Sequence, residues 1–231
     1  MPIVRDDYAL GREGNDSIGG GDGNDTLYGN TGNDVIGGGT GDDYVNAGAD
    51  QDAASGGYGA DTVLGGAGDD TLAGSYGNDS VDGGVGNDNM GGGTGRDTLT
   101  GGDGNDSIGA GDDDDVLAGE AGHDFLAGGA GDDTIGGGTG SDTLNGGSGS
   151  DLLQGGGGAD LFVFNDLGAG ETDVIEDFEN GTDLIRISGA APADLSFETV
   201  SGGVAIGIDG FTILVEGVTT AELTTGDIIF V

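Results

Sequence analysis

Gly65-Gly66-Ala67-Gly68-Asp69-Asp70-Thr71-Leu72-Ala73 is the stretch that decides the fold, because close variants of it follow one another without a gap. From residue 11 to residue 163 the chain divides into 17 nonapeptides with no insertion or deletion. Position six is Asp and position eight is apolar in all 17 units, and position four is Gly in 15. A fixed period of this kind indicates an architecture in which each unit stacks on its neighbours.

Each nonapeptide has the pattern of a turn followed by a short strand. Gly at positions one, two and four marks a turn that needs positive φ or close backbone approach. Asp50 and Asp113, which replace Gly at position four, tolerate the left-handed region better than most residues. Positions six to nine place one apolar residue among outward-facing ones, which predicts a strand of three or four residues. Two units then form one 18-residue coil, and stacked coils form two parallel sheets in a rod roughly 40 Å long.

Such a rod has too thin a core to stay folded by burial alone. One Leu-sized side chain per unit contributes ~1.5–3 kcal/mol, whereas ordering the chain costs roughly 1–2 kcal/mol per residue. The Asp residues at position six also stack one coil apart, where two charges repel by ~0.9 kcal/mol in water. Carboxylates beside glycine carbonyls, with no His or Cys nearby, form the all-oxygen environment that Ca²⁺ prefers.

The charge of the array also predicts bound cations. The chain carries 44 acidic and 4 basic residues, for a net charge of −40, and residues 11–163 carry −27 of it. The 17 turns leave 15 gaps between successive turns of the same edge, so we expect up to about 15 Ca²⁺ ions, which would bring +30. The expected metal ligands are the Asp residues at position six: Asp16, Asp25, Asp34, Asp43, Asp52, Asp61, Asp70, Asp79, Asp88, Asp97, Asp106, Asp115, Asp124, Asp133, Asp142, Asp151 and Asp160.

The unit resembles the Gly-Gly-x-Gly-x-Asp-x-(apolar)-x repeat of RTX, or haemolysin-type, calcium-binding proteins over about two thirds of the chain. The resemblance implies an all-β fold, a right-handed parallel β-roll (β-solenoid) with Ca²⁺ held between turns by Asp carboxylates and turn carbonyls. Two units depart from the pattern. The unit at 47–55 begins with Ala47 and has the small Ala54 in the core, and the unit at 110–118 contains the run 112–115, four consecutive Asp. If ion sites are missing, we expect them to be missing at these two units.

The composition changes after Val163, where Gly becomes rarer and β-branched residues cluster. We expect residues 1–10 to be an N-terminal leader, 11–163 the β-roll, and 164–231 a small β segment that caps the open end. Strands are predicted at 161–164, 173–178, 183–187, 197–200, 204–208, 211–215 and 228–231, with a hairpin turn at Asp209-Gly210. The stretch 173–189 resembles the segment that follows RTX repeats in serralysin-type secreted proteins. Asp173 and Asp177 either add a last Ca²⁺ site or lie on a solvated strand face.

The two termini point to export. Residues 1–7 contain no apolar core of a signal peptide. The last residues, Asp227-Ile228-Ile229-Phe230-Val231, resemble the acidic and apolar tail that type I export systems recognise in RTX proteins. We therefore expect a secreted, extracellular protein with the type I export machinery and Ca²⁺ as partners.

Several classes of function are excluded or disfavoured. The charge of −40 excludes sequence-independent nucleic-acid binding, which needs Lys or Arg, and argues against an anionic membrane surface. The chain has no Cys, hence no disulfide, no thiolate nucleophile and no zinc–thiolate site. The longest apolar run, residues 228–231, is far shorter than a membrane span.

We find no catalytic constellation and predict that the chain is not an enzyme. His123 is the only His and occupies the variable position five, so we expect an exposed turn residue. The paired carboxylates are explained by cation binding rather than by glycosidase chemistry. The tyrosines form no matched stripe in the sequence and are interpreted as surface residues rather than a carbohydrate platform: Tyr8, Tyr28, Tyr44, Tyr58 and Tyr76.

Three functions remain open. The first is an exported, non-enzymatic calcium-binding β-roll in a surface, matrix or adhesive role. The second is the folding and export module of a larger secreted enzyme such as a protease, lipase or epimerase. The third is an ice-binding solenoid, which the broken threonine row disfavours: Thr26, Thr62, Thr98 and Thr134 alternate with Tyr44, Ser80, Val116 and Leu152.

Overall fold

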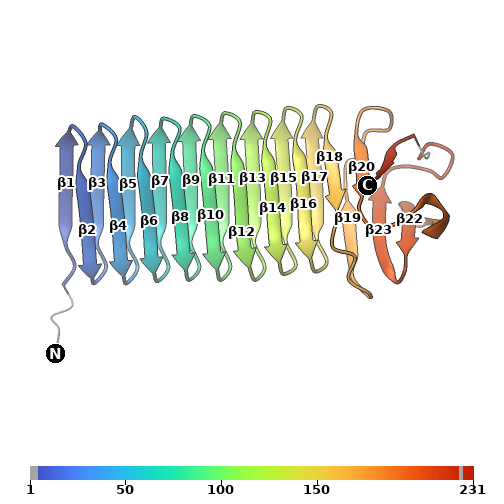
Figure 1. Ribbon diagram of the computed structural model, residues 1–231, viewed down its shortest axis with the longest axis horizontal. Coiled ribbons are helices and arrows are strands. Elements are labelled where there is room, and N and C mark those ends of the chain that lie inside the picture. Colours follow the sequence, from blue (N-terminus) through green and yellow to red (C-terminus); the bar gives the residue numbers. More distant parts are fainter. Residues whose placement is uncertain (1–4, 224–225) are drawn as a thin grey trace.

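The computed structural model describes residues 5–223 and 226–231 and shows a rod of stacked β-strands (Figure 1). Its strands form two sheets, one of 13 strands and one of 11 strands. In spatial order, the larger sheet contains β1 (Tyr8–Glu13), β3 (Thr26–Thr31), β5 (Tyr44–Ala49), β7 (Thr62–Ala67), β9 (Ser80–Val85), β11 (Thr98–Asp103), β13 (Val116–Ala121), β15 (Thr134–Thr139), β17 (Leu152–Gly157), β19 (Thr172–Ile175), β23 (Phe211–Glu216), β22 (Gly203–Ile208) and β21 (Leu195–Val200). The smaller sheet contains β2 (Ser17–Asp22), β4 (Val35–Thr40), β6 (Ala53–Tyr58), β8 (Thr71–Tyr76), β10 (Asn89–Thr94), β12 (Ser107–Asp112), β14 (Phe125–Ala130), β16 (Thr143–Ser148), β18 (Leu161–Phe164), β20 (Leu184–Ile187) and β24 (Ile228–Phe230).

Odd and even strands separate into different sheets because each coil consists of two nonapeptides. Every array strand pairs in parallel with the strand one coil away, as Leu27 with Val45 and Ile36 with Ala54. The predicted all-β parallel solenoid is confirmed. Among the described residues the one helical segment is a short 3-10 turn, η1 (Pro192–Asp194), and no helix is long and apolar enough to cross a membrane.

The array strands are longer than the sequence predicted. Each of β1 to β17 has six residues and runs from position seven of one unit to position three of the next, instead of the three or four residues expected. The difference arises because Gly at positions one and two continues the strand, although Gly is usual in turns. Only positions four to six form the turn.

Gly has two different roles within the unit. Positions two and four adopt positive φ, as in Gly66 (φ 106°) and Gly68 (φ 144°). Asp50 and Asp113 adopt the left-handed region at φ 79° and 80°, as predicted from their tolerance of it. Position one has ordinary φ and faces the interior. Gly is needed there for close packing rather than for a turn.

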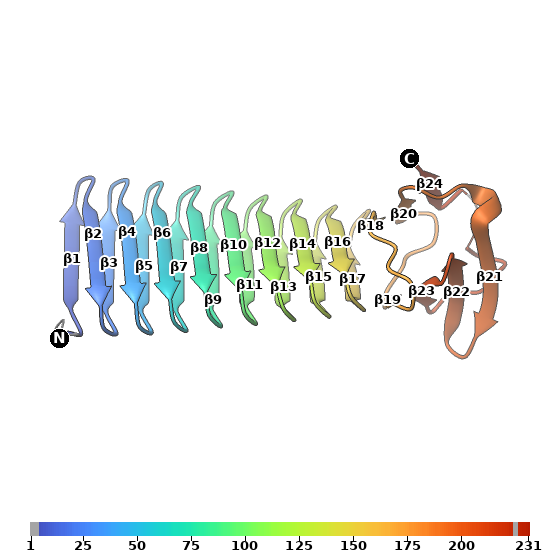
Figure 2. The ribbon, with the colours of Figure 1, turned by 60° about the horizontal axis from the view of Figure 1, so that its bottom comes forward.

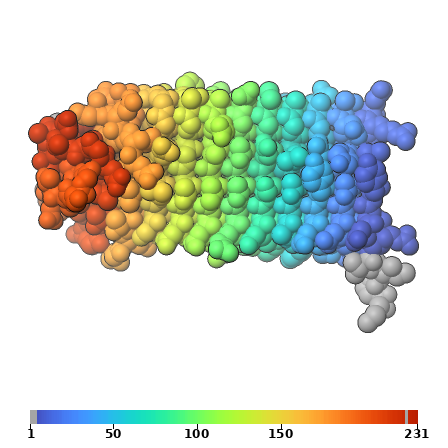
Figure 3. All heavy atoms as spheres, turned by 180° about the vertical axis from the view of Figure 1, so that it is seen from behind, coloured from blue at the N-terminus to red at the C-terminus, as the bar shows by residue number. Residues whose placement is uncertain are grey.

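The core is a double row of single apolar side chains, one from position eight of each unit, and further apolar side chains join it at the C-terminal end. Figure 2 shows that the strands from β19 to β24 at this end are arranged less regularly than those of the array. There Phe162 contacts Phe178, and Phe164 contacts Phe211, each pair with ring centroids 6.2 Å apart. Beyond β18 both sheets continue, so the C-terminal segment covers the end of the array. Figure 3 shows the rod from behind as regular rows of atoms that end in the less regular cap.

The expected boundaries fall inside strands. β1 begins at Tyr8, before the boundary expected at residue 10, and β18 ends at Phe164. The hairpin at Asp209-Gly210 joins β22 and β23, and both turn residues have positive φ, as a two-residue hairpin turn requires. The tail forms β24, which pairs in parallel with β20.

The structure corrects the interpretation of the tyrosines. Tyr8, Tyr28 and Tyr44 lie on successive strands of the larger sheet, with ring centroids 5.9 and 5.8 Å apart. Tyr58 and Tyr76 stack on adjacent strands of the smaller sheet. The first stripe was missed because Tyr28 lies at position nine of the unit, whereas Tyr8 and Tyr44 lie at position seven. The threonine row on the larger sheet is interrupted as expected, since Tyr44 lies between Thr26 and Thr62.

Candidate metal centre

The Asp residue at position six ends each turn and forms a continuous stack along each edge of the rod. Its backbone N–H donates to Oδ1 of the Asp one coil further on, at 2.7–2.9 Å throughout the array. In mid-array, for example, Asp79 donates to Asp97 and Asp97 donates to Asp115. Each carboxylate is thereby held in one orientation by the neighbouring turn.

The second oxygen of these carboxylates has no partner. Oδ2 is buried and accepts no hydrogen bond in sixteen of the seventeen repeat Asp residues, from Asp16 to Asp151. Asp97 is only 2% exposed. A buried carboxylate oxygen without a partner is costly, so sixteen of them, eight along each edge, indicate a ligand of positive charge.

The glycine at position one shows where the free oxygen points. A Cβ built on Gly65 would lie 2.6 Å from Asp70 Oδ2 and 2.6 Å from the carbonyl oxygen of Gly83, one coil away. The same arrangement recurs at Gly137, with Asp142 Oδ2 and the Gly155 carbonyl oxygen. A carboxylate oxygen and a carbonyl oxygen from neighbouring coils therefore converge beside position one.

This donor set fits Ca²⁺. Among residues 5–223 and 226–231, no three carboxylate, imidazole or thiolate side chains gather at one point. Each coil offers one carboxylate per edge, and the remaining ligands have to be backbone carbonyls. None of the turn hydrogen bonds ends on the position-four carbonyl, for example that of Gly41 or Gly59. Carboxylate and carbonyl oxygens in a flexible arrangement suit Ca²⁺ better than Mg²⁺ or a transition metal.

Burial makes the charged form of these carboxyls unfavourable. Desolvation raises the pKa of Asp97 to about 7, and repulsion from Asp79 and Asp115 adds to the rise, although the N–H of Asp79 opposes it. Burial likewise raises the pKa of Asp133 and Asp173 to about 7. Desolvation raises the pKa to about 6 in a further group: Asp43, Asp70, Asp115, Asp124, Asp151 and Asp160. Without a positive counter-charge, the ionised carboxylates of the stack therefore destabilise the folded chain at neutral pH.

The stack is longer than the 17 predicted residues. Asp7 donates to Asp25, Asp173 accepts from Asp151, and Asp183 accepts from Asp160. Asp173 and Asp183 were not placed in the stack from the sequence because 22 and 23 residues, instead of 18, separate them from their partners. The signal that could have found them is the Asp-x-apolar pattern of the repeat, which recurs at Asp173 and Asp183.

Asp177 does not share a site with Asp173. Its two oxygens accept the N–H groups of Gly155 and Gly156 at 2.9 and 2.8 Å. Asp173 instead extends the stack of Asp151, on the other edge. Asp173 is therefore buried in the stack and does not lie on a solvated face, whereas Asp177 binds the backbone of the last repeat. A last cation site at Asp173 stays a prediction.

The two irregular units keep the stack. Asp52 and Asp115 are 4% and 1% exposed, and each has a free Oδ2. Position one in these units is Ala47 and Ala110, both fully buried. By the register of the repeat, their methyl groups lie at the point where an Asp Oδ2 and a carbonyl oxygen converge beside Gly in other units, so any loss of affinity would arise there.

His123 is an exposed turn residue, as predicted, and has a structural contact as well. Its N–H donates to Asn105 Oδ1, and its Nδ1 accepts the N–H of Ser141, each at 2.7 Å. Side chains at position five form similar contacts in other turns, as when Asn87 Oδ1 accepts the backbone N–H of Asn105. The position-five side chains thus form a second series of hydrogen bonds between coils, outside the Asp stack, and the His123 imidazole takes the place of an Asn side chain in it.

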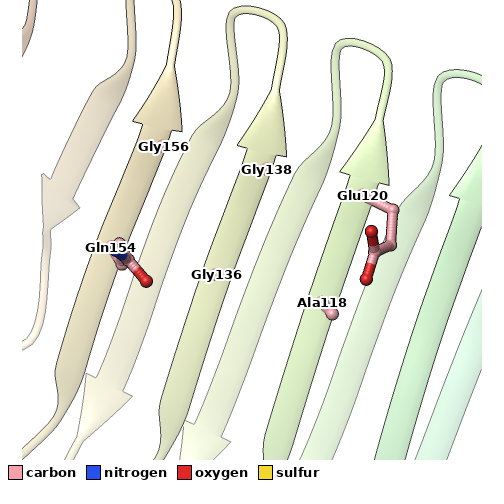
Figure 4. A pocket seen from close by; sticks show the side chains of 6 residues that line it. All are labelled: Ala118, Glu120, Gly136, Gly138, Gln154 and Gly156. Atoms are coloured by element: carbon pink, nitrogen blue, oxygen red, sulfur yellow. The ribbon is translucent and has the colours of Figure 1, made fainter.

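A shallow depression on the larger sheet is not part of this centre. It has a volume of about 240 Å³ and is lined by Ala118, Glu120, Gly136, Gly138, Gln154 and Gly156 (Figure 4). Figure 4 shows Glu120 and Gln154 on opposite sides of a floor without side chains. None of the partnerless Asp oxygens lines it.

A family model of the RTX calcium-binding nonapeptide repeat matches residues 5–36, 19–54, 55–90, 91–117, 109–144 and 136–166, and the chain belongs to this family. No curated protein matches the chain. Among solved structures, the extracellular lipase LipA of Serratia marcescens is similar at 20% identity and a TM-score of 0.43, over 74% of this chain and 40% of the lipase. The AlgE6R3 subunit of the Azotobacter vinelandii mannuronan C5-epimerase is similar at 26% identity and a TM-score of 0.23, over 55% of this chain and 78% of that subunit. The chain thus spans well under half the length of the lipase.

Proposed function

We propose that this chain is an exported, non-enzymatic protein that folds when its array binds Ca²⁺ outside the cell, in a surface, matrix or adhesive role. The observation that carries the proposal is the two rows of buried Asp Oδ2 atoms without a partner, sixteen atoms in all. A catalytic carboxylate is normally distinguished from its neighbours, whereas these are equivalent by repeat symmetry. Their common property is a need for positive charge.

The ligands in this proposal are the 17 Asp residues of position six and carbonyl oxygens of the adjoining turns. One ion between successive turns of the same edge gives up to about 15 ions, which offset the −27 charge of residues 11–163. When bound, Ca²⁺ supplies the positive charge that the core lacks. Since the unfolded chain has no preformed site, the binding free energy becomes folding free energy.

Export follows from the same coupling. Weak extracellular calcium modules need ~10⁻⁴–10⁻³ M Ca²⁺, far above the free concentration in a cytosol. The chain would stay unfolded inside the cell, in a form that an export channel can thread, and fold outside. The tail at 227–231 is proposed as the export signal. In the folded chain, residues Ile228–Phe230 form a strand that pairs with β20. The export machinery would therefore bind this signal before the chain folds.

Equilibrium dialysis with ⁴⁵Ca²⁺, together with circular dichroism, tests the proposal on the full chain. We expect several ions per chain and a β signal that appears only as they bind. Asp97→Asn should lower the ion count or raise the Ca²⁺ midpoint. Asp103→Asn, which removes the same charge from an exposed position, should change neither. A compact β signal that survives chelation, or equal effects of the two variants, would contradict the proposal.

A further inference from the structure

A row of side chains at position three crosses six neighbouring strands of the smaller sheet, from β2 to β12, and is not part of the metal centre. We call it the tyrosine row; strand register places its members side by side in the order Asp22, Thr40, Tyr58, Tyr76, Thr94 and Asp112. Neighbouring strands lie about 4.8 Å apart, so the row runs along the rod for about 24 Å. It is a straight track with one side chain per coil.

The centre of the row is two exposed aromatic rings that hold each other in place. Tyr58 and Tyr76 are 57% and 52% exposed. Their ring centroids are 4.5 Å apart and the rings are parallel within 3°. Two adjacent aromatic side chains that are each about half exposed form an apolar surface that a ligand can contact. Because the rings already stack, little side-chain entropy is lost when a ligand covers them.

An apolar depression lies on three of the same strands, at their N-terminal ends, whereas the tyrosine row crosses their C-terminal ends. It has a volume of about 230 Å³ and is lined on β4, β6 and β8 by small or apolar side chains, including Val35, Ala53 and Ala73. Val35 is 58% exposed. The four central residues of the tyrosine row and the lining of this depression carry no charge, on a protein with a net charge of −40.

The chemistry of the row selects its ligand. Its four central residues, Thr40 to Thr94, are uncharged, and Asp is present only at the two ends. A chain of net charge −40 repels acidic polymers, while a basic polymer would meet no carboxylate along the centre of the row. Aromatic faces are the negative side of a ring quadrupole and attract polarised C–H groups, and hydroxyls and carboxylates accept or donate hydrogen bonds to sugar hydroxyls.

We propose that the tyrosine row binds a neutral, extended polysaccharide that lies along the rod axis. An extended glycan repeats one pyranose ring at a spacing close to one coil, so successive rings can meet Thr40, the tyrosine pair and Thr94 in turn. The inference rests on the proposed function only in that the array must be folded by Ca²⁺; it gives the surface or matrix role a ligand class.

Affinity electrophoresis tests the proposal with the full chain in millimolar Ca²⁺. Gels would contain one of three neutral polymers (a β-glucan, a mannan or a xylan), with alginate and polylysine as the acidic and basic arms. We expect retardation by at least one neutral polymer. The double variant Tyr58→Ala/Tyr76→Ala should weaken it about tenfold, and Tyr58→Phe/Tyr76→Phe should stay within about threefold. Val85→Ala, at position three of the opposite sheet and 56% exposed, is the matched control and should bind like the unchanged chain.

The outcomes separate binding from folding. Circular dichroism of each variant in the same buffer reports whether Ca²⁺ folds the array, and therefore tests the proposed function independently. Absence of retardation by all three neutral polymers, with a normal folding signal, would overturn the polysaccharide proposal alone. So would stronger retardation by alginate, retardation by polylysine that Tyr58→Ala/Tyr76→Ala abolishes, or equal binding of the neutral polymers by the double alanine variant and Val85→Ala.

Discussion

Acidification should replace Ca²⁺ in folding this chain. The pKa values of Asp97, Asp133 and Asp173 rise from 3.8 to about 7 in the folded state because their carboxyls are buried. The folded chain therefore binds protons more tightly than the unfolded chain. The resulting stability is fully present below pH 3.8 and is lost as the pH rises through about 7.

The magnitude is large enough to observe. Each group that is protonated only in the folded state changes the free energy of unfolding by about 1.4 kcal/mol per pH unit. Three such groups give about 4 kcal/mol per pH unit, and solvent screening along the thin edges reduces this to about 2 kcal/mol. Over the two units below pH 7 the gain is about 4 kcal/mol, comparable to the stability of a small domain.

The assay is circular dichroism of the full chain in chelator, titrated from about pH 7.5 to about pH 5, where the chain remains above its pI of 4.1 and retains net negative charge. We expect a β signal with a midpoint near pH 6. Asp97→Asn removes one of the three groups and should move the midpoint to higher pH and make the transition less steep. Asp103→Asn should leave the steepness unchanged. If the metal-free chain remains unfolded over the whole range, burial of the carboxyls is not what calcium offsets.

Four further outcomes follow from the same geometry. Asp97→Ala should raise the Ca²⁺ midpoint at pH 7.5 several-fold more than Asp52→Ala, whose unit already has Ala at position one; the opposite ranking in a calcium titration would refute the weak-site assignment. Gly65→Ala should raise that midpoint because its methyl lies between Asp70 Oδ2 and the Gly83 carbonyl, whereas Gly109→Ala, with nothing near its Cβ, should not, as the same titration will show. Millimolar Mg²⁺ should fold the chain poorly, since Mg²⁺ needs near-octahedral geometry; equal dichroism in the two cations would argue against the ligand set. Deletion of 227–231 should retain the protein in the producing cell while Ca²⁺-dependent folding survives in vitro, and normal levels in the medium would rule out the tail as the signal.

Repeats made the fold predictable because each position has one environment throughout the array. The Asp at position six and the apolar residue at position eight occur in every unit, so the two edges and the core could be placed directly from the sequence. Strand length could not, because Gly at positions one and two is equally compatible with a turn. At Gly65 its role depends on two oxygens, Asp70 Oδ2, five residues away, and the Gly83 carbonyl, one coil away. The sequence around Gly65 does not show how close these oxygens lie to it.

The same limit applies to the ends of the stack and to the tyrosines. Asp183 joins the stack only because an insertion is looped out between β18 and β20, which changes the spacing without changing the register. Tyr58 and Tyr76 are 18 residues apart, one coil, and this spacing could have revealed their contact. Tyr28 could not be matched in that way, since its neighbours lie at a different position of the unit.

The cap and the cations are expected to stabilise different steps of folding: the cap the first coil, and the cations each further coil. In a stacked array each coil is stabilised by its own burial and by its neighbours. At the C-terminal end the aromatic pairs of Phe162 and Phe164 supply a large apolar contact, whereas at the other end Ile18 is only half-buried. Between them the apolar contribution of each coil is small and nearly constant, and the carboxylates oppose stacking. We therefore expect the first coil to form on the cap and Ca²⁺ to make each added coil favourable, so that order would extend from the cap towards the N-terminus.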